Sequence, residues 1–347
     1  MTIYAMDNYD FIQKGLNQME QIQDNKNTMK NAGRLFFILM ILTILVSLIY
    51  GIFYDSIPSE YNSLFSILIS QGYLLISALI YLKVTKTKMR RDLNLKKYKI
   101  SSFLLSILVL ILATPMSSFL NIISQLFAPN IIGSTITDIT GHLPLWAGVL
   151  IVGCLPGFIE ELIYRGIIYS AFKQRSIIWG MVISCLSFGL MHGNFNQIPY
   201  AIYLGFMFTL LVEATGSLAS SMILHMLFNG MSTVYLYILP KLYNILEQYG
   251  EEYANINVDE ILSSTPSKAE LISSAISIIP IAIIGVILAI LLLKKIANMN
   301  GNTLSWQAIC KKQEVEKPEK PISGWLIAGW IICILLAILC LYPSNQA

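Results

Sequence analysis

Long apolar runs restrict the fold of this sequence more than any other feature. A helix that crosses a bilayer needs about 20 mostly apolar residues, and about nine segments approach that length. Hydrophobic residues make up 55% of the 347 residues and charged residues 12%, which does not fit a water-soluble surface. We therefore expect an all-α, polytopic transmembrane helical bundle. The expected spans are Leu35 to Phe53, Leu64 to Leu82, Ser102 to Phe127, Leu145 to Phe172, Ile177 to His192, Ile198 to Val212, Leu218 to Leu239, Leu271 to Leu293 and Ile322 to Leu341.

The basic residues between these runs predict how the chain is oriented. Cytoplasmic loops of membrane proteins carry an excess of lysine and arginine. Such residues precede the first span and follow the second, fourth and eighth, whereas the connection between the seventh and eighth spans is net acidic. This alternation predicts a cytoplasmic N-terminus and an extracytoplasmic C-terminus, and we expect an integral protein of a bacterial plasma membrane. A net charge of +3, scattered along the chain, argues against a nucleic-acid partner.

Ionisable residues inside the apolar runs are confined to the middle of the chain. The first three and last two spans have none in their interiors. The informative side chains of the middle spans are Glu160, Glu161, Arg165, His192, His225 and Asn229. A charged side chain at the bilayer centre costs about 2.5 to 3.5 kcal/mol, so these groups must be paired and usually have a function. Glu161 and Arg165 are four residues apart with the acid first, which predicts an ion pair along one helix.

Glu160 is about 100° around the helix from Glu161, so it is expected to find a partner on another span. His192 and His225 lie at a similar depth and are the expected partners. Pro156 could bend the helix and open space beside Glu160. Close approach of the backbones is predicted at two steps of small residues, Gly153 with Gly157 and Gly189 with Gly193.

A carboxylate and an imidazole in a partly dry cavity can hold a water molecule between them. Glu160 would take a proton from that water as general base. His225 and Asn229, one helical turn apart, could donate hydrogen bonds to the oxyanion formed when a peptide carbonyl is attacked. Alternatively, Glu160, His192 and His225 could hold Zn²⁺ with an open position for water. The residues leave both hydrolytic mechanisms open, so no cofactor is assigned and zinc remains an alternative.

Three motifs in chain order resemble those of the CPBP family, the CAAX-protease and bacteriocin-processing intramembrane endopeptidases. They are Glu160-Glu161-x-x-x-Arg165, Phe188-x-x-x-His192 and His225-x-x-x-Asn229. The resemblance covers roughly Leu145 to Leu239. It implies that Glu160 and His192 activate water, that His225 and Asn229 stabilise the oxyanion, and that Glu161, Arg165 and Phe188 support them. It also implies a metal-independent glutamate mechanism acting on a peptide or membrane-protein substrate in the bilayer.

The resemblance and the charge pattern together divide the chain into five parts. These are a cytoplasmic segment (1–33), three transmembrane helices (34–144), a CPBP-like catalytic core (145–240), an extracytoplasmic loop (241–270), and two C-terminal helices with a charged cytoplasmic connection (271–347). The extra helices could bind a membrane protein partner. Two other functions remain open, a non-catalytic membrane scaffold or regulator and a proton-coupled transporter. A transporter should show two related halves, and the sequence shows none.

Overall fold

The computed structural model describes residues 28–247, 266–311 and 322–341, and every regular element in these residues is helical. Eight helices are long and apolar enough to cross a membrane, which confirms the all-α transmembrane prediction. The expected fifth span is present as a shorter apolar helix, α10. Seven of the eight long helices are α2 (Met29–Phe53), α3 (Asn62–Val84), α5 (Ile100–Gln125), α11 (Ile198–Thr215), α12 (Leu218–Glu247), α14 (Lys268–Met299) and α16 (Gly324–Leu341), and the shorter α10 covers Ile177–Met191. The eighth is the segment Leu145–Lys173.

The expected fourth span is a continuous helical rod, Leu145–Lys173, built of five pieces. These are α7 (Leu145–Gly148), π-helical η3 (Val149–Cys154), α8 (Leu155–Glu161), π-helical η4 (Leu162–Tyr169) and α9 (Ser170–Lys173). Pro156, which has no backbone N–H to donate, lies at the start of α8 directly after η3. π-Helical turns are rare and are frequent at functional sites. Here they flank the short helix that carries Glu160 and Glu161.

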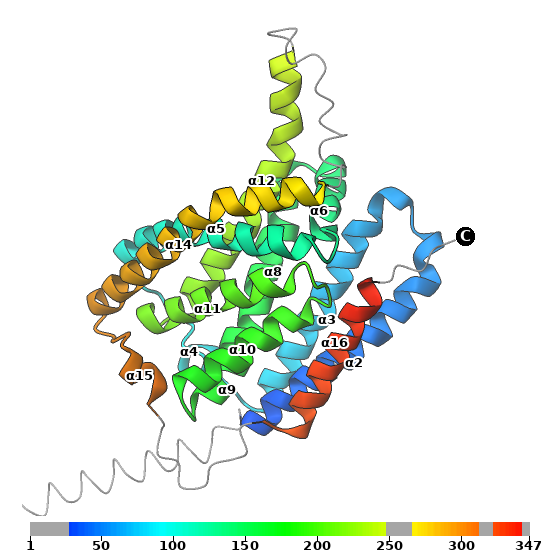
Figure 1. Ribbon diagram of the computed structural model, residues 1–347. Helices are drawn as coiled ribbons and strands as arrows, with labels where there is room; N and C mark the ends of the chain where they lie inside the picture. The colour runs from blue at the N-terminus through cyan, green and yellow to red at the C-terminus, as the bar shows by residue number, and fades with distance from the viewer. Residues whose placement is uncertain (1–27, 248–265, 312–321, 342–347) are drawn as a thin grey trace, which may run out of the picture.

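The rod, α10, α11 and α12 form the centre of the bundle, and the other helices pack on two sides of it (Figure 1). On one side α2 and α16 lie together although they come from opposite ends of the chain. Gly329 of α16 allows this contact, because a Cβ there would lie 2.7 Å from the Phe36 ring. On the other side α14 lies along α5, where Gly285 meets the Leu112 carbonyl.

The sequence predicts close helix contacts at two pairs of glycines. Gly153 and Gly157 of the rod both make such contacts, whereas only Gly189 of the pair around His192 does so. A Cβ on Gly157 would lie 2.7 Å from the backbone nitrogen of Met226, so α8 and α12 are in close contact. Gly189 approaches α11 in the same way, since its Cβ would lie 3.0 Å from the Ile198 carbonyl oxygen. Gly193 lies beyond α10 at φ +58°, a backbone conformation that favours glycine. It therefore shapes the turn after the helix.

Two local expectations were wrong. The sequence predicts no helix in the connection between the third and fourth spans, but this connection contains helix α6 (Ile131–His142), whose Ile136 and Ile139 pack with Val152 of the rod. With 12 residues α6 is too short to span a bilayer, so a pattern of long apolar runs does not reveal it. Helix α12 also continues to Glu247, into the segment assigned to the loop 241–270. The other remaining elements are short: η1 (Tyr54–Ser56), η2 (Ser59–Tyr61), α4 (Met89–Asp92) and α15 (Trp306–Cys310).

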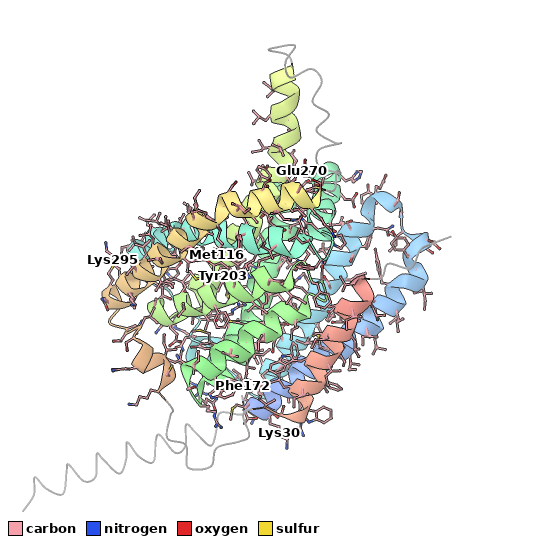
Figure 2. All side chains as sticks on the ribbon, in the orientation of Figure 1. Lys30, Met116, Phe172, Tyr203, Glu270 and Lys295 are labelled. Atoms are coloured by element: carbon pink, nitrogen blue, oxygen red, sulfur yellow. The ribbon has the colours of Figure 1, made fainter. Side chains whose placement is uncertain are left out.

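Two charged side chains, Lys30 and Glu270, lie at opposite ends of the bundle. Figure 2 shows Lys30 and Phe172 at one end and Glu270 at the opposite end. The alternation of charge along the sequence places Lys30 and Glu270 on opposite sides of the membrane, which is consistent with this separation. The predictions for residues 1–27, for most of the loop (248–265) and for part of the charged connection (312–321) fall on residues outside those described.

Candidate active site

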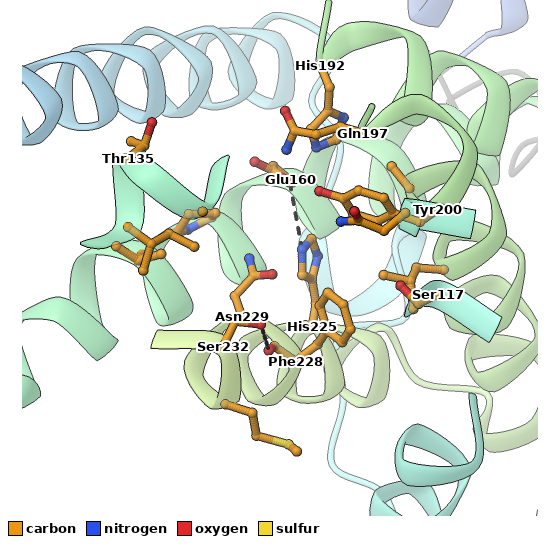
Figure 3. A pocket seen from close by; sticks show the side chains of 18 of the residues that line it. Ser117, Thr135, Glu160, His192, Gln197, Tyr200, His225, Phe228, Asn229 and Ser232 are labelled. Atoms are coloured by element: carbon orange, nitrogen blue, oxygen red, sulfur yellow. Dashed lines mark hydrogen bonds and ion pairs between the residues drawn. The ribbon is translucent and has the colours of Figure 1, made fainter. Parts of the chain in front are cut away.

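A cavity of about 870 Å³ lies between the central helices and α3, α5 and α6. Glu160, His192, His225 and Asn229 all line it, together with Phe188. Figure 3 shows Glu160 facing the His225 ring, with His192 and Gln197 beside Glu160 and Asn229 on the same helix as His225. The structure thus brings the four expected catalytic side chains to one cavity from three elements, the rod, α12 and the C-terminal end of α10.

Behind the cavity, Glu161 and Arg165 are buried as an ion pair. Arg165 Nη1 donates to Glu161 Oε1 over 2.9 Å, and both side chains are fully buried. The sequence predicted this pair from the spacing. The same Glu161 oxygen lies 3.0 Å from His225 Nδ1, a contact the sequence did not predict. Glu161 therefore joins the rod to α12 and holds the His225 ring in place.

Glu160 reaches a partner on another helix, as expected, through both of its carboxylate oxygens. Its Oε2 lies 3.8 Å from His225 Nε2, within ion-pair range but longer than a hydrogen bond. Its Oε1 accepts a hydrogen bond of 3.2 Å from Gln71 Nε2 of α3. Glu160 thus meets His225, one of its two expected partners, and His225 is shared between the two acids because its ring nitrogens face one glutamate each.

His192 caps the C-terminal end of α10 and lies 2.9 Å from the Phe188 carbonyl through its Nδ1. A carbonyl oxygen can only accept, so Nδ1 carries the proton and Nε2 of the neutral ring is left as an acceptor. In the described residues no hydrogen bond or ion pair joins His192 to Glu160. The two groups line the same cavity, as a pair that shares a water molecule would require.

Two phenylalanines fix the rings of the site. Phe188 contacts His192 and His225 edge-on at 5.1 and 5.7 Å between ring centroids, and the Arg165 guanidinium lies 4.3 Å from its centre. Phe208 of α11 stacks on His225 at 5.1 Å. Aromatic contacts of this kind hold a ring in one orientation. The sequence singled out Phe188 and missed Phe208, which is one of many aromatic residues in apolar runs.

Residues 142–231 match the family model described as type II CAAX prenyl endopeptidase Rce1-like. The match is to a model of the CPBP family and defines residues 142–231 as the CPBP segment. No curated protein and no solved structure matches the chain. At the family level the match supports an intramembrane CAAX-type protease, a hydrolase, and the protein is an integral membrane protein. The helices α2, α3, α5, α14 and α16 lie outside the CPBP segment.

The CPBP segment does not enclose the cavity by itself. Gln71 of α3 and a row of hydroxyl and amide side chains on α5 complete its wall. Gln71 is 6% exposed, and its Oε1 is buried without a hydrogen-bond partner. A buried polar atom without a partner is costly, so its position needs an explanation. Sequence reasoning missed Gln71 because an uncharged polar residue in a membrane helix is a weak signal compared with an ionised one.

Zinc was an alternative for Glu160, His192 and His225. Within the described ranges no group of three His, Cys, Asp or Glu side chains is placed to hold a metal ion. The three side chains as placed therefore do not form a three-ligand zinc site.

Proposed function

We propose that the protein is an intramembrane endopeptidase that hydrolyses a peptide bond in a membrane-associated peptide or protein. The observation that carries this proposal is the convergence of Glu160, His192, His225 and Asn229 on one cavity among membrane-crossing helices. Ionisable groups at such a place are costly unless they are paired and used. The CPBP match supports the same class of reaction.

In the proposed reaction, water lies between Glu160 and His192, with His192 Nε2 accepting one of its hydrogen bonds. Glu160 takes a proton from the water as the oxygen bonds to the carbonyl carbon of the substrate. The carbonyl π electrons move to its oxygen, and His225 and Asn229 donate to the resulting oxyanion. Glu160 then passes the proton to the amide nitrogen as the carbon–nitrogen bond breaks, which releases an amine and a carboxylic acid.

The charges behind the site support a donor role for His225. With Glu160 and Glu161 both ionised, as the proposed role of Glu160 as a base requires, two negative charges face the one positive charge of Arg165. If His225 is protonated, the buried cluster becomes neutral, which avoids the large free-energy cost of an unpaired buried charge. Its Nδ1 then donates to Glu161, and its Nε2 proton points to the side of Glu160 and the cavity. That proton is available to an oxyanion.

Gln71 is proposed as a positioning residue for Glu160. Its amide nitrogen occupies Oε1 of the carboxylate, which leaves Oε2 to take the proton from water. A hydrogen bond to a charged group contributes about 1.5 to 3 kcal/mol. This contact makes α3, outside the CPBP segment, part of the proposed catalytic apparatus.

Peptide cleavage by purified protein tests the proposal. Glu160→Ala and His192→Ala should each lower the rate by about 10² to 10⁴-fold, the usual contribution of a general base, while thermal unfolding remains cooperative. Full activity of Glu160→Ala protein would refute the assignment, and a scaffold would keep its function in that variant. Activity that survives a strong chelator would exclude an accessible catalytic metal, so the chelator separates the two mechanisms.

The proposal includes an orientation, with the N-terminus in the cytoplasm of a bacterial cell and the C-terminus outside the plasma membrane. It is supported by the separation of Lys30 and Glu270 to opposite ends of the bundle. Reporter fusions at the two termini should report opposite sides of the membrane. The eight long helices give an even number of crossings, so this result requires that α10 also crosses the membrane. Fusions that report the same side would overturn this orientation.

A further inference from the structure

The lining of the cavity is polar but almost uncharged. Among the described residues that line it, Glu160 is the only acid, and none is a lysine or an arginine. The nearest cation of the site, Arg165, is fully buried against Glu161 and lies outside the lining. Apart from the two histidines, the other polar groups are amides and hydroxyls. A ligand in this cavity therefore meets hydrogen-bonding groups but no lysine or arginine, and the His225 ring, if protonated, already faces Glu160 and Glu161.

These uncharged groups form an ordered wall on α5. Thr114, Ser117, Ser118 and Asn121 recur at the spacing of one helix face, and all four line the cavity. Figure 3 shows Ser117 on this wall, beyond Tyr200 and His225 as seen from Glu160. Asn121 Oδ1 already accepts from Gln125 Nε2 at 2.6 Å, so its amide N–H groups are the part left to offer.

A peptide that is to be cleaved must expose its main chain to the catalytic groups. Inside a membrane, each N–H and C=O group freed from a helix needs a new partner. Hydroxyls donate and accept, and amides do both, so the α5 wall can bind both kinds of main-chain group. The wall and Glu160 line the same cavity, so a chain in the cavity can contact both.

Charge limits which part of a substrate can enter. A free carboxylate in the cavity would share a desolvated space with the Glu160 carboxylate and would find no lysine or arginine there. The same holds for aspartate or glutamate side chains next to the scissile bond. An uncharged stretch has neither difficulty.

We propose that the cavity binds an uncharged, internal stretch of a peptide chain, with the scissile bond placed away from a free C-terminal carboxylate. The main chain of that stretch is bound by the polar face of α5. This inference rests on the proposed function, because it names the substrate class of the same site.

Three short fluorescent peptides of alanine, leucine, valine and glycine test it. The first ends in a free carboxylate, the second ends in an amide, and the third carries the carboxylate at the end of an added glycine-serine tail. Binding is measured by fluorescence anisotropy on the His192→Ala protein in nanodiscs, a variant that keeps the charge of Glu160. Empty nanodiscs give the background from partition into lipid, and the third peptide matches the charge of the first.

The first peptide should bind about tenfold or more weakly than the other two, which corresponds to about 1.4 kcal/mol. Equal or tighter binding of the first peptide would overturn the inference. Cleavage of the same peptides by the wild-type protein distinguishes failure of this inference from failure of the proposed function. If the second and third peptides bind more tightly than the first but the wild-type protein cleaves none of the three, the protease proposal fails and the binding inference stands. If the wild-type protein instead cleaves the first peptide preferentially, the protease proposal stands and the binding inference fails.

A substitution in the wall gives an independent measurement. Ser118→Arg places a cation in the cavity and should bring the first peptide to at least the affinity of the third. Ser118→Gln, of similar bulk but uncharged, should keep the original order. Thermal unfolding of both variants shows that the bundle is intact. If Ser118→Arg folds and leaves the order unchanged, the charge argument is wrong.

Discussion

The CPBP segment and the helices that flank it differ in what surrounds their apolar residues. In the rod and α11, 61% and 56% of the apolar stretch is buried within the protein, whereas α12 has 28% and the flanking spans α2, α3, α5, α14 and α16 have 17–28%. The acids and the arginine of the site lie in the rod. Ionised side chains are thus found where protein replaces lipid, which is the arrangement that the cost of a charge in hydrocarbon requires.

The flanking helices nevertheless take part in the site through one face each. α3 presents apolar side chains such as Ile76 and Leu79 to the outside, while Gln71 points inward to Glu160. α5 likewise exposes Leu104 and Ile111 on one face and lines the cavity with hydroxyls on another. The CPBP segment therefore provides the charged side chains of the site, and the flanking helices α3 and α5 add uncharged polar side chains.

Glu161→Gln should have the largest effect on stability, because it leaves Arg165 buried and without its charge partner. Removing one member of a buried pair costs about 3 to 5 kcal/mol. We expect a much lower yield of folded protein and a lower midpoint of thermal unfolding in detergent. Glu213→Gln is the matched control, since Glu213 pairs with the part-exposed Lys173, and such pairs contribute about 0 to 1 kcal/mol. Equal losses in the two variants would contradict the distinction between buried and peripheral charge.

Gly157→Ala should come next. Its methyl group would lie 2.7 Å from the Met226 backbone nitrogen, so α8 and α12 would have to move apart, at a cost of about 1 to 3 kcal/mol. Gly72→Ala on α3 is the control, because nothing lies within 4 Å of a Cβ there. Thermal unfolding should show a loss for the first variant and no loss for the second. A similar loss at Gly72 would mean that the core is packed no more tightly than the flanking helices.

Gln71→Leu should lower kcat about tenfold with KM nearly unchanged, because it removes a hydrogen bond worth about 1.5 to 3 kcal/mol from the proposed base. Ser106→Ala on α5 provides the control, since Ser106 Oγ donates to the Ser102 carbonyl within its own helix and does not line the cavity. Steady-state cleavage kinetics and thermal unfolding are measured on both proteins. A loss of stability with unchanged kcat would give Gln71 a structural role and would restrict the catalytic groups to the CPBP segment.

Trp330→Phe should have the smallest effect. Trp330 Nε1 of α16 donates to Ser187 Oγ of α10 at 2.9 Å, so the variant loses one neutral hydrogen bond between a flanking helix and the core. We expect about 0.5 to 1.5 kcal/mol in stability and no change in the rate of cleavage. A clear drop in rate, measured in the same assay, would show that α16 acts on the site as well as packing against it.

The candidate site could be predicted from the sequence where a single helix fixes the geometry or where a charge is costly. Glu161 and Arg165 pair because they are four residues apart, and that spacing holds in the folded chain. The contact between Glu161 and His225 could not be predicted, because it depends on how the rod and α12 are rotated toward each other. Helix α6 was missed because its length and composition do not distinguish it from a loop.

The sequence by itself determined that this protein is a helical membrane protein with its ionisable side chains in the central spans, because the bilayer allows few other uses of such apolar runs. Only the tertiary structure decided that His225 lies between two glutamates, that Gln71 contacts Glu160, and that α5 lines the same cavity. The physical reason is one of range. Periodicity and the cost of burying charge act along a single helix, whereas the partner of a side chain on another helix depends on packing angles that small residues such as Gly157 set.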